Sequence, residues 1–239
     1  MSERPYVLLS CAASIDGYID DNTDERLLLS NDEDFDRVDE VRASCDAILV
    51  GANTIRRDNP RLLVRAQQRR EDRVHRGLPE TPIKVTFTNR GDLDPQAQFF
   101  AAGDTEKIVF CANSGVDKCR DRLGSVATVV DAGDPVDLTA VLAELAARGV
   151  RRLMVEGGGT VHTQFLTAGF ADELQLVIAP FFVGDPEAPS FVGPGKFPHH
   201  PGHRMTVAEV RQIGDVILAR YLLTPSTQGS HRHLADNAR

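Results

Sequence analysis

The stretch RRLMVEGGGTVHTQFL, residues 151–166, decides the fold class of this 239-residue chain. Its short apolar run, Leu153 to Val155, predicts a buried strand. The run passes through Glu156 and three glycines into a segment that predicts a helix as far as Ala168. A strand that turns directly into a helix is typical of the repeating unit of a parallel sheet. The segment therefore favours an α/β protein.

Strand-like apolar runs recur on both sides of this segment. Before it they lie at residues 6–13, 46–50, 83–88, 107–111 and 126–130. Predicted helices alternate with them: one capped by Ser30, a short one after Gly51 that ends before Pro60, and one over Leu138 to Leu145. Residues 66–77 are almost wholly polar or charged, which predicts a solvated face or a mobile excursion.

The last third of the chain changes character. Strands are predicted at 172–180, 204–212 and 215–223 with no strong helix between them. We therefore expect a mixed, mostly parallel sheet with helices on both faces and antiparallel C-terminal strands at one edge. Residues 1–224 are expected to form a single domain, and 225–239 a disordered tail.

Charge and composition exclude several classes of protein. A net charge of −8 argues against a nucleic-acid partner, which would need a basic surface. No run approaches the roughly 18 apolar residues of a membrane helix, and the N-terminal residues show no signal peptide. The four cysteines contain no C-x-x-C pair and are expected to be reduced. A cytoplasmic protein with no membrane partner is predicted.

Gly157, Gly158 and Gly159 follow a strand, where an open α/β sheet binds its ligands. Backbone N–H groups there can approach a diphosphate closely, and the N-terminus of the next helix, with Thr160, favours negative charge. A tight turn that needs positive φ is the alternative, although one turn does not need three glycines. The spacing is not G-x-G-x-x-G, which disfavours a conventional Rossmann domain.

Thr88-Asn89-Arg90 follows the predicted strand 83–88. Arginine and small polar donors at such a position suit the extra phosphate of NADPH, whereas an NADH site places a carboxylate on the ribose. An ordinary polar turn explains the same residues equally well. Asn89 and Arg90 are therefore candidate NADPH ligands.

A third candidate region is GANTIRRDNPRLLVR, residues 51–65. Thr54 and Asp58 are four residues apart and so face the same side of a helical turn. Leu62 and Arg65 return along an extended segment after Pro60. Arginine can capture a phosphate bidentately. A solvated basic stretch is the plainer alternative, but the interleaved threonine, aspartate and proline favour a binding site.

Three stretches together make the chain resemble the reductases of riboflavin biosynthesis. They are PYVLLSCAASIDG (5–17), RASCDAILVGANTIRRDNPRLLVR (42–65) and VEGGGTVHTQFL…DELQLVIAP (155–180), and the resemblance runs from Pro5 to about Leu223. It implies a dihydrofolate-reductase-like fold, a homodimer and NADPH as cofactor. Members of that family reduce the ribosylamino side chain of a diaminopyrimidine or aminouracil 5′-phosphate to the ribitylamino form.

The resemblance also implies the residues that line each ligand. The NADPH site would contain Ala12, Thr54, Asp58, Asn89 and the segment 158–164. The small phosphorylated pyrimidine would meet Ser14, Arg42, Leu62, Arg65 and Glu156, with Arg65 on its phosphate. No metal is implied. The chain lacks the H-x-E…P-C-x-x-C signature of a zinc deaminase, so we expect the reductase alone.

Reduction also needs a proton, and Glu156 and Asp58 are the candidate catalytic carboxylates, with water as the alternative. In this chain Ser10 and Leu28 stand where bacterial members commonly have lysine and tryptophan. Dihydrofolate reductase activity and a non-catalytic NADPH-binding protein are therefore the alternative functions.

Histidines and a late apolar stretch give three further expectations. The histidines of FPHHPGHR (197–204) have no cysteine or carboxylate at ligand spacing, so no metal site is predicted. His162 is either a spectator or a group whose pKa a nearby phosphate raises. A dimer surface is predicted from the apolar residues Leu174, Leu176, Val177, Ile178, Phe181 and Phe182.

Overall fold

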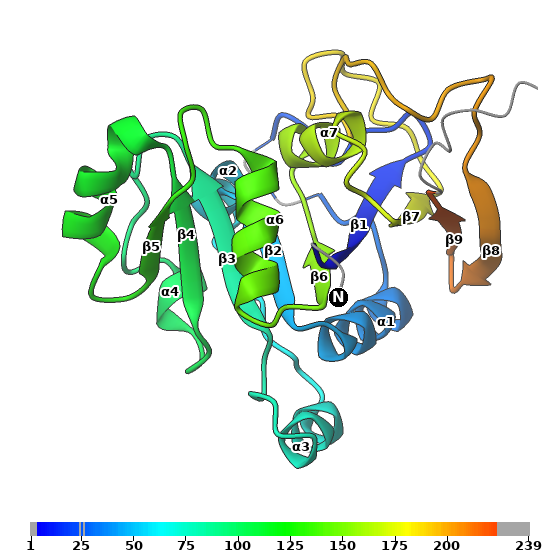
Figure 1. The fold of residues 1–239 in the computed structure, drawn as a ribbon. Helices are drawn as coiled ribbons and strands as arrows, with labels where there is room; N and C mark the ends of the chain where they lie inside the picture. The colour runs from blue at the N-terminus through cyan, green and yellow to red at the C-terminus, as the bar shows by residue number, and fades with distance from the viewer. Residues whose placement is uncertain (1–3, 24, 26, 224–239) are drawn as a thin grey trace, which may run out of the picture.

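One mixed sheet runs through the part of the chain that the computed structural model describes, residues 4–23, 25 and 27–223 (Figure 1). Its strands are β1 (Tyr6–Ser14), β2 (Ala47–Gly51), β3 (Ile83–Thr88), β4 (Lys107–Cys111), β5 (Thr128–Asp131), β6 (Arg152–Val155), β7 (Glu173–Ala179), β8 (Thr206–Ile213) and β9 (Val216–Leu222). Their order is β5-β4-β3-β2-β6-β1-β7-β9-β8. Strands β1 to β7 are parallel, and β9 is antiparallel to both β7 and β8. The predicted sheet is therefore confirmed.

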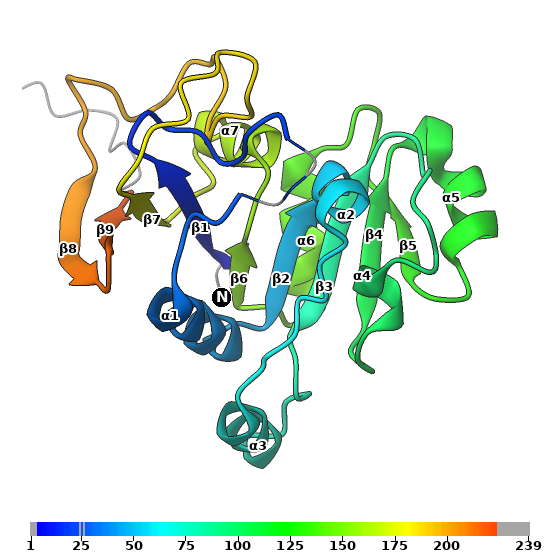
Figure 2. The same ribbon diagram turned by 180° about the vertical axis from the view of Figure 1, so that it is seen from behind.

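Helices cover both faces of the sheet, as predicted. They are α1 (Asp32–Ser44), α2 (Ala52–Asp58), α3 (Gln67–His75), α4 (Gln98–Ala101), α5 (Val116–Leu123), α6 (Leu138–Ala147) and α7 (Gly159–Thr167), with a 3-10 turn at Asn113–Gly115. Helices α6 and α7 pack on one face, and α1, α2, α4 and α5 on the other (Figure 2). None of the helices within the described ranges combines the length and apolar character that a bilayer span requires.

Alternation along the strands builds two apolar layers. Leu9 and Val155 point toward Leu145 of α6 and Phe165 of α7 in one core cluster. Their strand neighbours, including Leu8, contribute to the other cluster, which also holds the α4 phenylalanines. Side chains of successive strand residues point to opposite faces, so each central strand supplies both layers. This explains why the strands are continuous apolar runs in the sequence.

Strand β6 occupies the centre of the sheet. The chain moves outward from β2 through β3 and β4 to β5, and then returns through α6 to insert β6 between β2 and β1. Val155 is paired with Leu9 of β1 on one side and with Leu49 of β2 on the other. The carboxyl ends of three strands thus meet where the strand order reverses, which is where such sheets bind ligands.

Some local predictions were wrong. Asn31, not Ser30, caps α1, because its side chain accepts a hydrogen bond from the Asp34 N–H. Residues 67–75 form α3, which extends away from the sheet (Figure 1). The guanidinium of buried Arg73 in α3 donates to the carbonyls of Ala43 and Cys45, so hydrogen bonds hold this polar helix to the end of α1. Helix α5 had no counterpart in the prediction, and the predicted tail, 225–239, lies outside the described residues.

Candidate functional site

The glycine turn after β6 is tied to the adjacent strand and helix. The Gly51 N–H donates to the Gly157 carbonyl at 2.9 Å, and the Glu156 N–H donates to the Leu49 carbonyl at 2.9 Å. The Gly158 N–H donates to the Thr54 hydroxyl of α2 at 3.4 Å. Two regions that the sequence assigned to the cofactor, the glycine turn and Thr54, are therefore in contact.

The three glycines differ in what a side chain at each position would meet. Gly157 has φ of +134°, which side chains disfavour. A Cβ on Gly159 would lie 2.2 Å from the Ser190 carbonyl oxygen, so that glycine permits a close backbone contact. A Cβ on Gly158 would lie 3.3 Å from the Thr54 hydroxyl. The tight-turn alternative thus accounts for Gly157, and close packing for Gly159, while a role of Gly158 in binding a ligand stays a prediction.

Helix α7 begins at this turn with no side chain capping its first N–H groups. An uncapped helix N-terminus is suited to an anion, because the N–H groups point outward and the helix dipole is positive there. A segment following β7 packs beside it: the Gly193 N–H donates to the Thr163 hydroxyl, and the Phe191 N–H to the Gly17 carbonyl. The β1–α1 connection and α7 are therefore held together.

His162, in the first turn of α7, is completely buried, and neither ring nitrogen has a hydrogen-bond partner among the described residues. Burial lowers its pKa to about 4, so the ring is neutral at physiological pH. The ring of Phe191 packs against it edge-on, with centroids 5.7 Å apart. The sequence analysis allowed that a nearby phosphate raises the pKa of His162, whereas burial in this structure lowers it.

Arg42 of α1 and Glu156 at the end of β6 form a bidentate ion pair, with N–O distances of 2.6 and 2.5 Å. Both side chains are largely buried, at 19% and 12% exposure. Burial works to lower the pKa of Arg42, but the charge of Glu156 and its hydrogen bonds outweigh this and raise it. A third contact, from Arg42 to the Leu63 carbonyl at 3.3 Å, connects the pair to residues 59–66, the 60s segment. Two predicted substrate residues are thus brought together.

The 60s segment has an unusual backbone. Asn59 and Leu62 have φ of 44° and 48°, in the left-handed region. Leu62 is buried at 3% exposure in the core cluster of that face. The buried side chain of Leu62 therefore packs the segment onto the core. Its contact with a substrate stays a prediction.

Arg65, the predicted phosphate ligand, has a side chain that is 58% exposed. Its Nη2 donates to the Phe35 carbonyl at 2.7 Å, and its guanidinium lies 5.8 Å from the centre of the Phe35 ring. Its Nε lies 3.8 Å from the buried Asp39 carboxylate, so these contacts hold the guanidinium against α1 while more than half of the side chain stays open to solvent.

Asn89 and Arg90 are both exposed beyond β3. The buried Thr88 hydroxyl accepts from the N–H groups of Arg90 and Gly91 at 3.2 and 3.3 Å, which fixes the turn. The next acid along the chain, Asp92, pairs with Arg56 of α2. Burial works to raise the pKa of Asp92, but Arg56 outweighs it and lowers the pKa.

The remaining predicted residues lie around the same strand ends. Ala12 is half-buried beside Val177 of β7, and Asp58 is exposed at the end of α2. The Ser14 hydroxyl donates to Asp16 at 2.5 Å and accepts from the Tyr18 N–H at 3.0 Å. It is buried, so in this structure it stabilises the turn after β1, and its contact with a substrate stays a prediction.

The two positions that depart from the bacterial pattern differ in their surroundings. Ser10 is buried in β1, whereas Leu28 is 63% exposed.

His199 and His203 stack with ring centroids 4.7 Å apart. Among the described residues no group of three His, Cys, Asp or Glu side chains is arranged to hold a metal ion.

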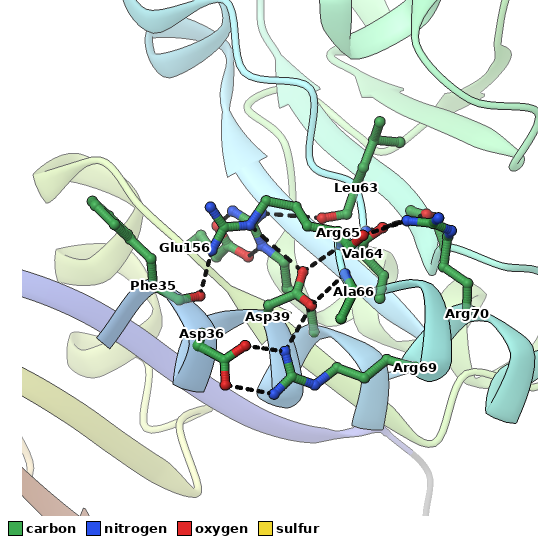
Figure 3. A network of polar contacts seen from close by, with 12 residues as sticks. Phe35, Asp36, Asp39, Leu63, Val64, Arg65, Ala66, Arg69, Arg70 and Glu156 are labelled. Carbon is green, nitrogen blue, oxygen red and sulfur yellow. Dashed lines mark hydrogen bonds and ion pairs between the residues drawn. The ribbon is translucent and has the colours of Figure 1, made fainter. Parts of the chain in front are cut away.

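One acid in contact with this site, Asp39, has only a weak signal in the sequence. Asp39 of α1 accepts hydrogen bonds from the backbone N–H groups of Arg65 and Ala66 (Figure 3). It stands in an acidic stretch, DEDFDRVDE, residues 32–40, where nothing separates it from the exposed carboxylates around it. Its spacing of three residues from Arg42, on one helix face, was the available clue.

The chain has relatives among known proteins. The chain is 34% identical over 187 residues to the 2,5-diamino-6-ribosylamino-4(3H)-pyrimidinone 5′-phosphate reductase of Archaeoglobus fulgidus, covering 78% of this chain and 85% of that protein. It is 33% identical over 220 residues to the enzyme of the same name from Methanothermobacter thermautotrophicus, covering 91% and 98%.

The fold has counterparts among solved structures. A pyrimidine reductase-like protein from Corynebacterium diphtheriae superposes with a TM-score of 0.75 at 23% identity, covering 92% of each chain. The model of the family described as the RibD C-terminal domain matches residues 5–219. Since that match spans nearly the whole described sheet, the chain belongs to the RibD C-terminal domain family.

Proposed function

We propose that this protein reduces the ribosylamino side chain of a pyrimidine 5′-phosphate to the ribitylamino form, with NADPH as reductant, as a cytoplasmic homodimer. The observation that carries the proposal is the position of Arg65. Its side chain is 58% exposed. Arg65 follows Leu63 by two residues in the chain, and the Leu63 carbonyl accepts a hydrogen bond from Arg42 of the Arg42–Glu156 pair. The names of the relatives, which are 5′-phosphate reductases, supply the substrate class.

The donor set fits NADPH. The N-terminus of α7, which no side chain caps, suits the diphosphate, and Thr54 contacts the same turn at Gly158. Asn89 and Arg90 are exposed donors for the additional phosphate, and the nearby carboxylate of Asp92 is offset by Arg56. When bound, NADPH supplies a hydride for the first carbon of the opened ribose.

The residues of the chain would bind and orient the substrate. Arg65 would hold the phosphate. The Arg42–Glu156 pair would orient the pyrimidine part of the substrate by hydrogen bonds to its polar atoms. Both oxygens of Glu156 are bound by Arg42 in this structure, so proton delivery from Glu156 would require a shift of that pair. Asp58 and water therefore remain donors in the proposal.

Oxidation of NADPH, followed at its absorbance band, tests the activity. The pyrimidine phosphate is expected to be turned over, and turnover of dihydrofolate alone would overturn the proposal. Tight NADPH binding without turnover of either would favour a non-catalytic protein. Arg65→Ala is expected to raise KM for the phosphate about ten- to a hundredfold, the equivalent of one charge-assisted hydrogen bond. Arg61→Ala, at an exposed arginine of the same segment, is the matched control.

A second copy of the chain would cover the outer strands. Leu174 and Val177, predicted in the dimer surface, are buried within the protein's own core. Three other apolar side chains, Val207, Val210 and Ile217, are 59%, 63% and 47% exposed. The β8–β9 register places them on one sheet face. Sedimentation at micromolar concentration is the test, and Val210→Glu is expected to give a monomer.

A further inference from the structure

The carboxylate of Asp39 is buried in the middle of α1, with its side chain at 2% exposure. It accepts from the Arg65 N–H at 2.5 Å, the Ala66 N–H at 3.1 Å and Arg69 Nη1 at 2.9 Å (Figure 3). All three donors come from one short segment at least 26 residues along the chain. A buried carboxylate is tolerated only when such donors surround it, so this contact is specific.

The hydrogen bonds keep Asp39 ionised. Burial works to raise its pKa, but the two backbone N–H groups and Arg69 outweigh burial and lower it. Arg69 is held on its other side by Asp36 through two hydrogen bonds of 2.6 and 2.8 Å. Asp36 is mostly exposed, and its hydrogen bonds go to the Arg69 guanidinium, not to the backbone of Arg65 or Ala66. The carboxylates of Asp36 and Asp39 therefore share Arg69, but only Asp39 of the two also accepts hydrogen bonds from the Arg65 and Ala66 N–H groups.

The segment that Asp39 holds needs such a restraint. Left-handed backbone at Leu62 is unfavourable for a residue with a branched side chain, and it persists only where surrounding contacts fix it. Arg42 contacts the Leu63 carbonyl, and Asp39 fixes the two residues that follow Val64. The Arg65 side chain then extends from a fixed Cα toward Phe35 on the same helix.

Phe35, Asp39 and Arg42 are spaced by four and three residues, so they lie on one face of α1. That face contacts the Arg65 side chain, the Arg65 backbone and Glu156 in turn. The helix thus sets the separation between the exposed guanidinium and the ion pair at the strand ends.

We infer that Asp39 is a positioning residue for phosphate recognition: it fixes the backbone at Arg65 so that the guanidinium is already placed when the substrate's phosphate arrives. This inference rests on the proposed function. A preplaced group binds more tightly because less conformational freedom is lost on binding. Asp39 acts through Arg65, so it governs KM for the phosphorylated substrate and leaves kcat and NADPH affinity unchanged.

The test is Asp39→Asn, which keeps the shape of the side chain but puts an N–H donor where an acceptor is needed. KM for the pyrimidine phosphate is expected to rise about tenfold or more, with kcat and NADPH affinity within about twofold. The preference for the phosphorylated over the dephosphorylated substrate is expected to fall by the same factor. The matched control is Asp36→Asn, which loosens Arg69 but leaves the Arg65 and Ala66 backbone bonds, and its KM is expected to be unchanged.

A double-mutant cycle separates positioning from a purely structural role. In the Arg65→Ala background, Asp39→Asn is expected to add little to KM, because the group it positions is gone. An equal effect in both backgrounds would overturn the inference, as would a lower melting temperature with no change in phosphate preference. Should Asp39→Asn fail to fold, Ala66→Pro removes one bond from the other side, since the φ of Ala66, −67°, already suits proline.

Calorimetry with ribose 5-phosphate makes the outcome independent of turnover. If the wild-type protein binds it but reduces no pyrimidine phosphate, the proposed function fails. The inference is then supported if Asp39→Asn weakens the binding of ribose 5-phosphate about tenfold while Asp36→Asn does not, and it is overturned if Asp39→Asn leaves that binding unchanged. Wild-type turnover with unchanged KM in Asp39→Asn overturns the inference alone, and a wild-type protein that neither binds nor reduces overturns both.

Discussion

Arg42 of α1 and Glu156 at the end of β6 are joined by hydrogen bonds of 2.6 and 2.5 Å, although 114 residues separate them in the chain. This pair fixes a helix to the central strand of the sheet, at the point where the strand order reverses. Because neither side chain is more than one-fifth exposed, removing one charge leaves the other poorly solvated.

Glu156→Gln is therefore expected to cost about 1–3 kcal/mol of unfolding free energy, discounted for partial exposure, and to lower kcat/KM at least about tenfold. Urea unfolding and the NADPH oxidation assay measure the two effects. Glu106→Gln breaks the much more exposed pair with Arg148 and is expected to change stability by less than about 0.5 kcal/mol. Equal stability losses in the two variants would contradict this account of Glu156.

Substitutions in the glycine turn should separate cofactor binding from folding. Gly158→Ala places a methyl group 3.3 Å from the Thr54 hydroxyl, which a small shift can accommodate. We expect a folded protein whose NADPH affinity, measured by fluorescence titration, falls about tenfold because the diphosphate's approach is blocked. Gly159→Ala would place the methyl group 2.2 Å from a backbone oxygen, so its melting temperature should fall most. Unchanged NADPH affinity in Gly158→Ala would make the turn purely structural.

Arg90 is expected to select NADPH over NADH. Arg90→Ala should weaken NADPH binding about tenfold, close to the lower limit for a charge-assisted hydrogen bond at an exposed site, and leave NADH binding unchanged. Titrating both cofactors against both proteins gives the comparison. Lys118→Ala, at an exposed cation on α5, controls for a general loss of positive charge. Equal wild-type affinities for the two cofactors would contradict the role of the loop.

His162 should make the fold sensitive to acid. Its pKa is about 4 in the folded protein against 6.5 ordinarily, so the unfolded chain binds this proton at higher pH than the folded one. Stability therefore falls as pH decreases from about 6.5 to about 4, by about 3 kcal/mol from this group. His162→Phe should flatten that part of the curve in urea unfolding, while His75→Phe, at an exposed position, should not. Parallel curves for His162→Phe and wild type would contradict the assignment.

The sheet and the glycine turn were predictable because their sequence signals are local. A buried parallel strand is a continuous apolar run, and only Glu156 separates Val155 from the three glycines. Helix α3 was missed because it has no apolar stripe, and distant carbonyls at Ala43 and Cys45 satisfy its Arg73. Hydrogen bonds to distant carbonyls leave no periodic pattern in the sequence.

Arg65 and Glu156 were predictable from local stretches, residues 51–65 and the strand end before the glycines. Arg42 was predictable only through family resemblance, because 114 residues separate it from Glu156 and conceal the contact. Asp39 was missed for a related reason: two of its three partners are backbone N–H groups, which every residue type except proline offers. Two residues of the predicted dimer surface are buried within the chain: Leu174 packs in the core cluster of one sheet face, and Val177 packs with Val216 and Leu218. Homodimer formation itself stays a prediction.

The insertion of β6 between β1 and β2 has a consequence for synthesis of the chain. Strand β1 is made first, yet its sheet neighbours, β6 and β7, begin at Arg152 and Glu173. Tyr6 pairs with Arg152, so the nascent protein exposes an unpaired apolar strand until most of the chain has left the ribosome. Such distant pairings slow folding and expose strand edges to aggregation. Expression at lower temperature, or with a chaperone that shields apolar segments, is therefore expected to raise the folded yield more than any stabilising change in α3.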